Sequence, residues 1–325
     1  FGIALVVPLL LWDVLRRDST LLLRAHLAAN TVLALLFAVG PFVAGSAAWE
    51  NGGSFASGSR LQGALLATLP PGVGEVGAIV AGLALVAWAY GHLRWWLTTP
   101  LVALGLGLII TSRTRTAALA LLVGLIIAAL VTLRSRGGRH IAIGLAICAV
   151  PLLAVAPAVV DWALRGQSTQ RFQSLSGRTL AWNNVLSADL PPGVAALGHG
   201  LGTTKILVTR GQGDVNTVPI DNSWLSLYWE SGLIGAAVIL VVYLCVLVTV
   251  LRAPTAYPRA ASVLLVVLVG IASFSESGLS DLSSLTLALV VAAYTADLDR
   301  WLARRRPPDG DDPAPYAEAL PAGAA

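Results

Sequence analysis

Long apolar segments constrain the fold of this chain more than any other feature of its sequence. A helix that crosses a bilayer needs about 20 mainly apolar residues, and nine stretches of the chain reach or approach that length. Unbroken apolar runs favour helices over a β-barrel, because barrel strands alternate apolar and polar residues. We therefore expect an all-α, polytopic integral membrane protein. The nine expected transmembrane helices cover roughly residues 1–14, 25–44, 73–90, 95–111, 116–133, 141–160, 231–251, 261–275 and 282–299.

The composition excludes the other broad classes of protein. Of the 325 residues, 56% are hydrophobic and 12% are charged, whereas an ordinary soluble domain carries about 25% charged residues. A disordered chain would need low hydrophobicity and a high net charge. The sequence begins with Phe1 inside an apolar run, so we expect further spans to precede it.

Two longer polar connections, 45–72 and 161–222, separate these spans. Loops as long as the second are usually functional, and we expect it to contain a short helix over about 179–188. The expected organisation is transmembrane helices over 1–160, an extracytoplasmic loop over 161–222, transmembrane helices over 223–299 and a disordered tail over 300–325.

Arginine and lysine residues in the short links predict the orientation of the chain. One set of alternate links holds thirteen arginines, whereas the opposite set holds eight cations, five of them in the long loop, where the rule has little force. The turn 112–115 and both long connections are therefore expected outside, and the C-terminus in the cytoplasm. The thirteen are Arg16, Arg17, Arg24, Arg94, Arg134, Arg136, Arg139, Arg252, Arg259, Arg300, Arg304, Arg305 and Arg306.

No sequence motif indicates a nucleotide, a metal or a disulfide framework. The chain has no Walker loop, dinucleotide fingerprint or His-Glu-x-x-His sequence, and both of its cysteines lie in apolar runs. We therefore expect no metal and no cofactor. The net charge of +4 is interpreted as a signal of membrane orientation rather than of nucleic-acid binding.

Two arginines, Arg113 and Arg115, lie in the short outward turn Thr111–Thr116. Cations are disfavoured on that side and are costly at depth in the bilayer. One interpretation is that both side chains extend to lipid headgroups. The other is an anion site, because guanidinium groups stay charged and bind phosphate in a bidentate manner. A lipid-linked phosphate or diphosphate is then a sensible ligand.

Arg178 and His199 are the candidate residues inside the long loop. Arg178 precedes the expected short helix, where it either pairs with Asp189 or Asp161 or binds an anion. His199 lies in the glycine-rich turn Leu197–Gly202, where a histidine is more often an exposed turn residue. The turn does not have the strand and helix context of a phosphate-binding loop.

Two acids accompany the later spans. Asp221 begins the sequence Asp-Asn-Ser-Trp-Leu ahead of an apolar run, so it is either a helix N-cap or a functional acid. Glu276 lies beside the last outward turn, where the alternative is a solvated carboxylate. The aromatic residues Trp224, Tyr228 and Trp229 suit a membrane interface, and aromatic rings also stack on sugars.

In their order along the chain, these motifs resemble the O-antigen ligase and polymerase superfamily of bacterial envelope glycan assembly. They are a Ser-Arg turn, Gly-Arg-x-x-x-Trp, Gly-x-Gly-Leu-Gly, and Asp-Asn-Ser-Trp-Leu followed by Glu-Ser-Gly-Leu-Ile-Gly. The likeness covers roughly residues 95–299, and the order and spacing of the motifs carry it. The matching stretches are Ser112–Arg115, Gly177–Trp182, Leu197–Gly202, Asp221–Gly235 and Phe274–Leu279.

The resemblance implies a membrane glycosyltransferase of the bacterial cytoplasmic (inner) membrane. Members of the family take a glycan from a polyprenyl-diphosphate-linked donor, undecaprenyl diphosphate being the carrier. They transfer it on the outer face to a glycan or lipid acceptor, as a polymerase or a ligase, with neither a nucleotide sugar nor a metal. The implied partners are the donor, the acceptor and membrane lipids, and not nucleic acid.

The resemblance also implies roles for single residues. Arg178, with Arg113 or Arg115, binds the donor diphosphate. Asp221 stands where ligases typically carry a histidine that is proposed as the base for the acceptor hydroxyl, so polymerase and ligase both stay open. A carboxylate near that hydroxyl is chemically competent for the proton transfer. We expect Arg178 and Asp221 to be catalytic, and the expected substrate-binding residues are Arg113, Arg115, Asn222, His199 and Glu276.

Two other classes of protein remain as alternatives. A transporter or flippase for lipid-linked glycans would also place arginines near the membrane. It would be expected to show polar residues through its spans and related halves of the chain, whereas these spans are almost purely apolar. A non-catalytic scaffold for envelope assembly would not require Arg113, Arg178 and Asp221 to converge.

Overall fold

The computed structural model describes most of the chain. The expected first span at 1–14 and the tail from residue 306 onward lie outside the described residues. The described ranges are 18–50, 59–154, 156–164, 178–210, 214–276, 278–279 and 283–305.

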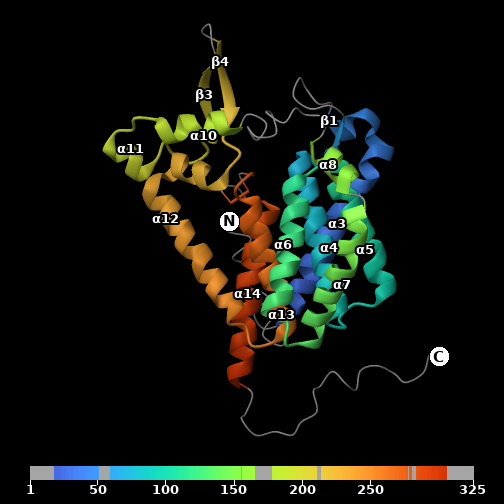
Figure 1. The fold of residues 1–325 in the computed structure, drawn as a ribbon. Helices are drawn as coiled ribbons and strands as arrows, with labels where there is room; N and C mark the ends of the chain where they lie inside the picture. The colour runs from blue at the N-terminus through green and yellow to red at the C-terminus, as the bar shows by residue number, and fades with distance from the viewer. Residues whose placement is uncertain are drawn as a thin grey trace, which may run out of the picture.

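Apolar helices run side by side and form a bundle (Figure 1). The helix α12 (Ser223–Leu251) leans away from the bundle at the end near α10 and α11 (Figure 1). The bundle consists of α3 (Leu21–Ala44), α4 (Pro70–Ala89), α5 (Trp95–Ser112), α6 (Arg115–Val131), α7 (Arg136–Ala154), α13 (Ala256–Ala272) and α14 (Ser284–Arg305).

Helices α4 and α13 form the centre of the bundle. Almost the whole of α4 is buried, and Val73, Ile79 and Val80 are fully enclosed. Leu264 and Leu265 of α13 pack in the same cluster as Ile79. Both helices are apolar around most of their circumference, and sequences of this kind favour burial of the whole helix.

A pair of glycines allows α4 and α5 to approach each other closely. A Cβ atom at Gly77 would lie 2.5 Å from the carbonyl oxygen of Gly105, and a Cβ at Gly105 would collide with the carbonyl of Gly77. Small residues are the usual means of close helix packing in membranes. The contact holds the middle of α5 against α4, and Gly74 of α4 lies close to Ser112 and Thr114 at the turn.

Among the described residues, four helical segments are long and apolar enough to cross a membrane. They are Leu21–Ala48, α4, α5 and α12, while α6 and α13 are shorter apolar helices. The prediction of a mostly helical membrane protein is therefore confirmed. The count of nine spans stays a prediction.

Most expected segments correspond closely to observed helices. The segments predicted at 73–90 and 95–111 are α4 and α5, and the loop helix predicted over 179–188 is α10 (Arg178–Ser187). The segment predicted at 141–160 is divided between α7 and a separate short helix, α8 (Ala156–Leu164). Apolar runs therefore located the helices well.

The helix predicted over 231–251 begins eight residues earlier than expected. The helix α12 starts at Ser223 and contains a break at Gly232, where φ is 67°. Polar residues lie ahead of the break, so a prediction based on apolar runs does not include the first turns of α12. The expected loop of 161–222 therefore gives way directly to a helix.

The expectation of an all-α fold is incomplete, because the described part of the chain contains two antiparallel strand pairs. The strands β1 (Trp49–Glu50) and β2 (Arg60–Leu61) form one pair. The strands β3 (Lys205–Arg210) and β4 (Asp214–Pro219) form a hairpin inside the long loop. The strand β3 is rich in β-branched and apolar residues, which favour strands, and its Ile206 is buried whereas Leu207 is exposed.

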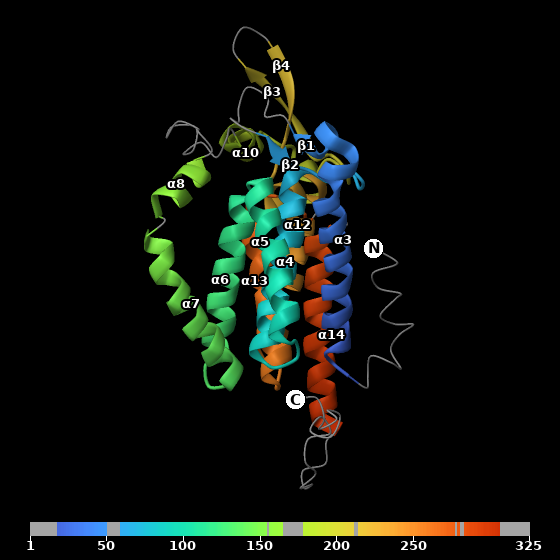
Figure 2. The same ribbon diagram turned by 90° about the vertical axis from the view of Figure 1, so that its right-hand side faces the viewer.

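The connections that carry the candidate residues gather at one end of the bundle (Figure 2). Both strand pairs and α10 lie at that end, beside the link between α5 and α6. The links from α4 to α5 and from α6 to α7 lie at the opposite end (Figure 2). This alternation agrees with the two sets of links that the arginine distribution separates. Which end faces outward stays a prediction.

Candidate functional site

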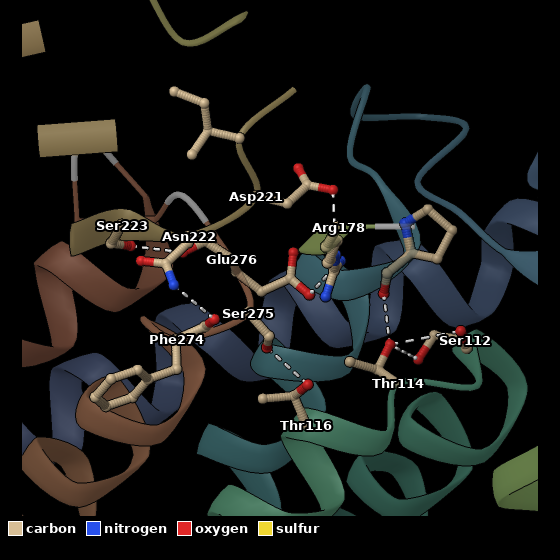
Figure 3. Close-up of polar contacts among 12 residues, drawn as sticks. Ser112, Thr114, Thr116, Arg178, Asp221, Asn222, Ser223, Phe274, Ser275 and Glu276 are labelled. Carbon is tan, nitrogen blue, oxygen red and sulfur yellow. Dashed lines mark hydrogen bonds and ion pairs between the residues drawn. The ribbon is translucent and has the colours of Figure 1, made fainter. Parts of the chain in front are cut away.

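Arg178, the first residue of α10, lies between two carboxylates (Figure 3). Its Nε is 3.3 Å from Oδ2 of Asp221, and its Nη2 is 3.4 Å from Oε1 of Glu276. The side chains are 26%, 34% and 16% exposed, respectively. The alternative that Arg178 anchors its helix through an ion pair therefore stays open, but its partners are Asp221 and Glu276 rather than Asp189 or Asp161.

Local structure places Asp221 at the start of α12. It follows β4 and adopts a left-handed backbone conformation with φ of 44°, which few residues other than glycine adopt. The indole of Trp182 on α10 donates a hydrogen bond to the carbonyl of Ile220 at 2.8 Å. This bond ties the helix that carries Arg178 to the segment that carries Asp221.

Asn222, not Asp221, is the N-cap of α12. Its Oδ1 accepts hydrogen bonds from the backbone N–H groups of Trp224 and Leu225, both at 3.0 Å. Its Nδ2 donates to the carbonyl of Phe274 at 3.1 Å. The role of Asn222 in substrate binding stays a prediction, and its side chain is engaged in these three bonds.

A second residue, Ser223, fastens α12 to the turn after α13. Its hydroxyl donates to the carbonyl oxygen of Glu276 at 2.6 Å and accepts from the backbone N–H of Leu279 at 3.1 Å. Figure 3 shows this contact beside that of Asn222. The position of Glu276 next to Arg178 therefore depends on the first turn of α12.

The electrostatic surroundings of Glu276 are unusual for a carboxylate. Burial raises its pKa to about 7, the charge of Arg178 opposes that rise, and the charge of Asp221 adds to it. A carboxyl group with a pKa near neutrality exchanges protons readily at physiological pH. The expectation that Glu276 is simply solvated does not describe this environment.

The turn that carries Arg113 lies beside the same site. Ser275 donates from its hydroxyl to Oγ1 of Thr116 at 2.8 Å, which joins the start of α6 to the residue preceding Glu276 (Figure 3). Arg113 caps the end of α5 with a left-handed φ of 52°, and Arg115 begins α6. The structure thus places the two expected anion-binding segments at one end of the bundle.

Arg60 is a residue of this region that the sequence argument passed over. Its Nε donates to the carbonyl oxygen of Ser112 at 3.0 Å. Burial lowers its pKa, and smaller effects come from Glu50 and Glu276, which raise it, and from Arg178 and Arg113, which lower it. The sequence does offer one signal for a role of Arg60. It lies in a connection expected on the outer side, where the positive-inside rule disfavours arginine.

His199 is exposed and lies against the first part of α12. Its ring stacks on Trp229 with centroids 3.9 Å apart, and its backbone N–H donates to the carbonyl of Trp229 at 2.9 Å. In the same turn, the backbone N–H of Gly202 donates to Oε2 of the buried Glu230 at 2.9 Å. The glycine-rich turn therefore packs against α12 just before the helix breaks at Gly232. Substrate binding by His199 stays a prediction.

The aromatic residues expected at the interface make specific internal contacts. The indole of Trp224 donates to the hydroxyl of Ser273 at 3.0 Å. Tyr228 and Trp229 pack against the small cluster formed by α10, β3 and the start of α12. These contacts support the geometry of the site from the side of the long loop.

The arrangement combines clustered guanidinium groups with two carboxylates that differ in exposure. Such a set can neutralise a phosphate or diphosphate and can accept a proton. Among the residues that the structure describes, no group of three or more His, Cys, Asp and Glu side chains is arranged to hold a metal ion.

Comparison with known families gives a match to part of the chain. No curated protein and no solved structure matches the chain. Residues 100–240 match the family model described as O-antigen ligase. The matched range includes Arg113, Arg115, Arg178 and Asp221, so it contains both arginine segments and the acid that they accompany. The part of the chain that carries these groups is therefore similar to the O-antigen ligase family.

Proposed function

We propose that the chain is a membrane glycosyltransferase that uses a polyprenyl-diphosphate-linked glycan at the outer face of the cytoplasmic membrane. The observation that carries this proposal is the position of Arg178 between Asp221 and Glu276, beside the turn of Arg113. These groups lie at one end of a bundle of apolar helices (Figure 2). A lipid-linked diphosphate has a matching arrangement, with an anionic head and an apolar tail.

In the proposed reaction, the bond between the anomeric carbon of the glycan and the diphosphate oxygen breaks. Negative charge then develops on the leaving diphosphate. Arg113, Arg115 and Arg178 neutralise that charge, which lowers the barrier because the donors are already in place. Arginine suits this role better than lysine, because its planar fork binds two oxygens at once.

Asp221 accepts the proton of the acceptor hydroxyl while the oxygen of that hydroxyl attacks the anomeric carbon of the glycan. It is the more exposed of the two carboxylates that contact Arg178, so an acceptor reaches it more readily. A bound diphosphate competes with both carboxylates for the guanidinium of Arg178. Donor binding therefore releases Asp221 for proton transfer.

The direct test is transfer by the purified protein in detergent. We expect consumption of a polyprenyl-diphosphate-linked glycan in the presence of acceptor, and strong loss in Arg178→Ala and Asp221→Ala. Arg300→Ala is the matched control, because Arg300 pairs with its helix neighbour Asp297 at 2.9 Å near the C-terminal end of α14. Unchanged transfer in both site variants would refute the proposal.

Ligase and polymerase differ in the acceptor rather than in this chemistry. Deletion of the gene separates them. Short surface glycans indicate a polymerase, whereas full-length glycans that stay on the carrier lipid indicate a ligase.

A further inference from the structure

Arg60 connects the first outward segment of the chain to the turn that presents Arg113. Its Nε donates to the carbonyl oxygen of Ser112 at 3.0 Å, across 52 residues of sequence. Its Nη1 lies 3.4 Å from Oε2 of Glu50, its partner in the pairing of β1 with β2. The side chain of Arg60 is only 16% exposed. The guanidinium is therefore held from two directions.

The carbonyl that Arg60 contacts belongs to the residue just before Arg113. Arg113 has a φ of 52° and a ψ of 39°, in the left-handed region that side chains with a Cβ rarely adopt. Such conformations persist where the surrounding structure holds them in place. The backbone on the N-terminal side of Arg113 therefore needs an external constraint.

Hydrogen bonds on the other side of Arg113 complete that constraint. The hydroxyls of Ser112 and Thr114 lie 2.9 Å apart, and Thr114 donates to the carbonyl of Pro70 at 3.1 Å. Both bonds appear in Figure 3. They fix the turn against α4, whereas Arg60 fixes the same turn from the loop side.

We propose that Arg60 is a positioning residue of the donor diphosphate site, which holds the left-handed turn that presents Arg113. This inference rests on the proposed function. An arginine is required because its Nε–H and Nη1–H point in different directions, toward Ser112 and toward Glu50. A lysine keeps the positive charge but has no such fork.

The test measures binding of a polyprenyl diphosphate to the full chain in detergent, with the polyprenyl alcohol as the tail-only control. We expect Arg60→Lys to weaken diphosphate binding by about tenfold, the size of one charge-assisted hydrogen bond, and to leave alcohol binding unchanged. In transfer assays, KM for the donor rises, and kcat also falls because Arg113 neutralises the charge that develops on the leaving diphosphate. Glu50→Ala, which removes the acceptor on one side of the fork, is expected to weaken binding in the same direction.

Arg259→Lys is the matched control. Arg259 also donates from Nε to a backbone carbonyl, that of Ala253 at 2.6 Å. It lies at the start of α13, near the opposite end of that helix from Glu276. We expect this variant to lose some thermal stability and to bind the diphosphate as the parent protein does.

A double-mutant cycle decides whether Arg60 acts through Arg113. If it does, Arg60→Lys has little further effect in an Arg113→Ala background, because coupled residues are not additive. An equal loss in both backgrounds, or no loss in either, overturns the inference while the proposed function stands. A parent protein that binds the diphosphate no better than the alcohol overturns both.

Discussion

The guanidinium of Arg178 and the carboxylate of Asp221 lie 3.3 Å apart, although 43 residues separate them in the chain. The same guanidinium contacts Glu276, 98 residues away. One cation therefore faces two acids. In the proposed reaction, a diphosphate that enters this site would compete with groups of its own charge and would change the partners of all three residues.

Replacement of Arg178 is expected to reduce transfer through the transition state. We expect Arg178→Ala to lower kcat by about 10²–10³-fold, as the loss of one preorganised charge-stabilising group does in other enzymes. Arg178→Lys is expected to recover only part of that loss, because an ammonium group does not provide the bidentate fork. Steady-state kinetics with a lipid-linked donor measure both effects. Full activity in Arg178→Lys would show that the fork is not needed.

The helical part of the fold could be predicted from the sequence. Runs of apolar residues predict spans because the bilayer leaves few other options, and α4 and α5 lie close to their expected positions. Asp221 and Arg178 could be identified as candidates from their motifs. Their contact could not, because it joins residues 43 positions apart, which no local pattern predicts.

Three features of the site escaped prediction for physical reasons. The N-cap could not be assigned to Asn222 rather than Asp221, because both residue types cap helices well. The break at Gly232 could not be predicted, because Gly232 lies against the end of α11 (Pro192–Leu197). This is a tertiary contact that the local sequence does not show. The proposed role of Arg60 depends on its contact with the carbonyl of Ser112. Arg60 is far from both Arg113 and Arg178 in the sequence, so the sequence does not reveal this contact.

The raised pKa of Glu276 predicts a pH-dependent stability. Burial raises this pKa from 4.5 to about 7, so the folded state binds a proton more strongly than the unfolded chain. The resulting stabilisation is present below pH 4.5 and is lost as the pH rises through about 7. The thermal midpoint of the parent protein should therefore fall relative to that of Glu276→Gln over this range.

Thermal unfolding in one detergent at several pH values measures this difference. Asp297→Asn is a suitable control, because Asp297 is 66% exposed and pairs only with its helix neighbour Arg300 among the contacts described. Parallel curves for the parent and Glu276→Gln from pH 5 to pH 8 would contradict the assignment of the proton to Glu276.

The break in α12 predicts a strong effect of a methyl group at Gly232. Gly232 has φ of 67°, and a Cβ there would collide with the carbonyl of Ala196. We expect Gly232→Ala to cost at least about 1–2 kcal/mol, the cost of a left-handed residue, and to disturb the contact of Glu230 with Gly202. Gly193→Ala in α11 is the control, because a Cβ there meets nothing within 4 Å.

Comparison of the unfolding midpoints of these two glycine variants measures the effect. Gly193→Ala is expected to be neutral or slightly stabilising, since alanine favours helix. Equal midpoints in the two variants would mean that the break at Gly232 is not needed for the fold.

The N-cap contacts of Asn222 allow its structural role to be separated from substrate binding. Asn222→Ala removes an acceptor shared by two N–H groups and is expected to destabilise the protein by about 0.5–2 kcal/mol. Asn222→Asp keeps the capping acceptor and loses the donor to Phe274. We therefore expect Asn222→Asp to retain most of the stability of the parent protein, while Asn183→Ala, at an exposed position of α10, serves as the control.

Kinetics of Asn222→Asp then decide between the two roles. If Asn222 acts only as cap and tether, the loss of the bond to Phe274 loosens the turn that holds Glu276, and kcat falls in step with stability across the series. If Asn222 binds substrate directly, Asn222→Asp raises KM for donor or acceptor without loss of stability, because the new carboxylate changes the charge and donor pattern that the substrate meets. Thermal midpoints and KM values, measured on the same preparations, distinguish these outcomes. We expect the first pattern, since Oδ1 and Nδ2 of Asn222 both have backbone partners in the structure.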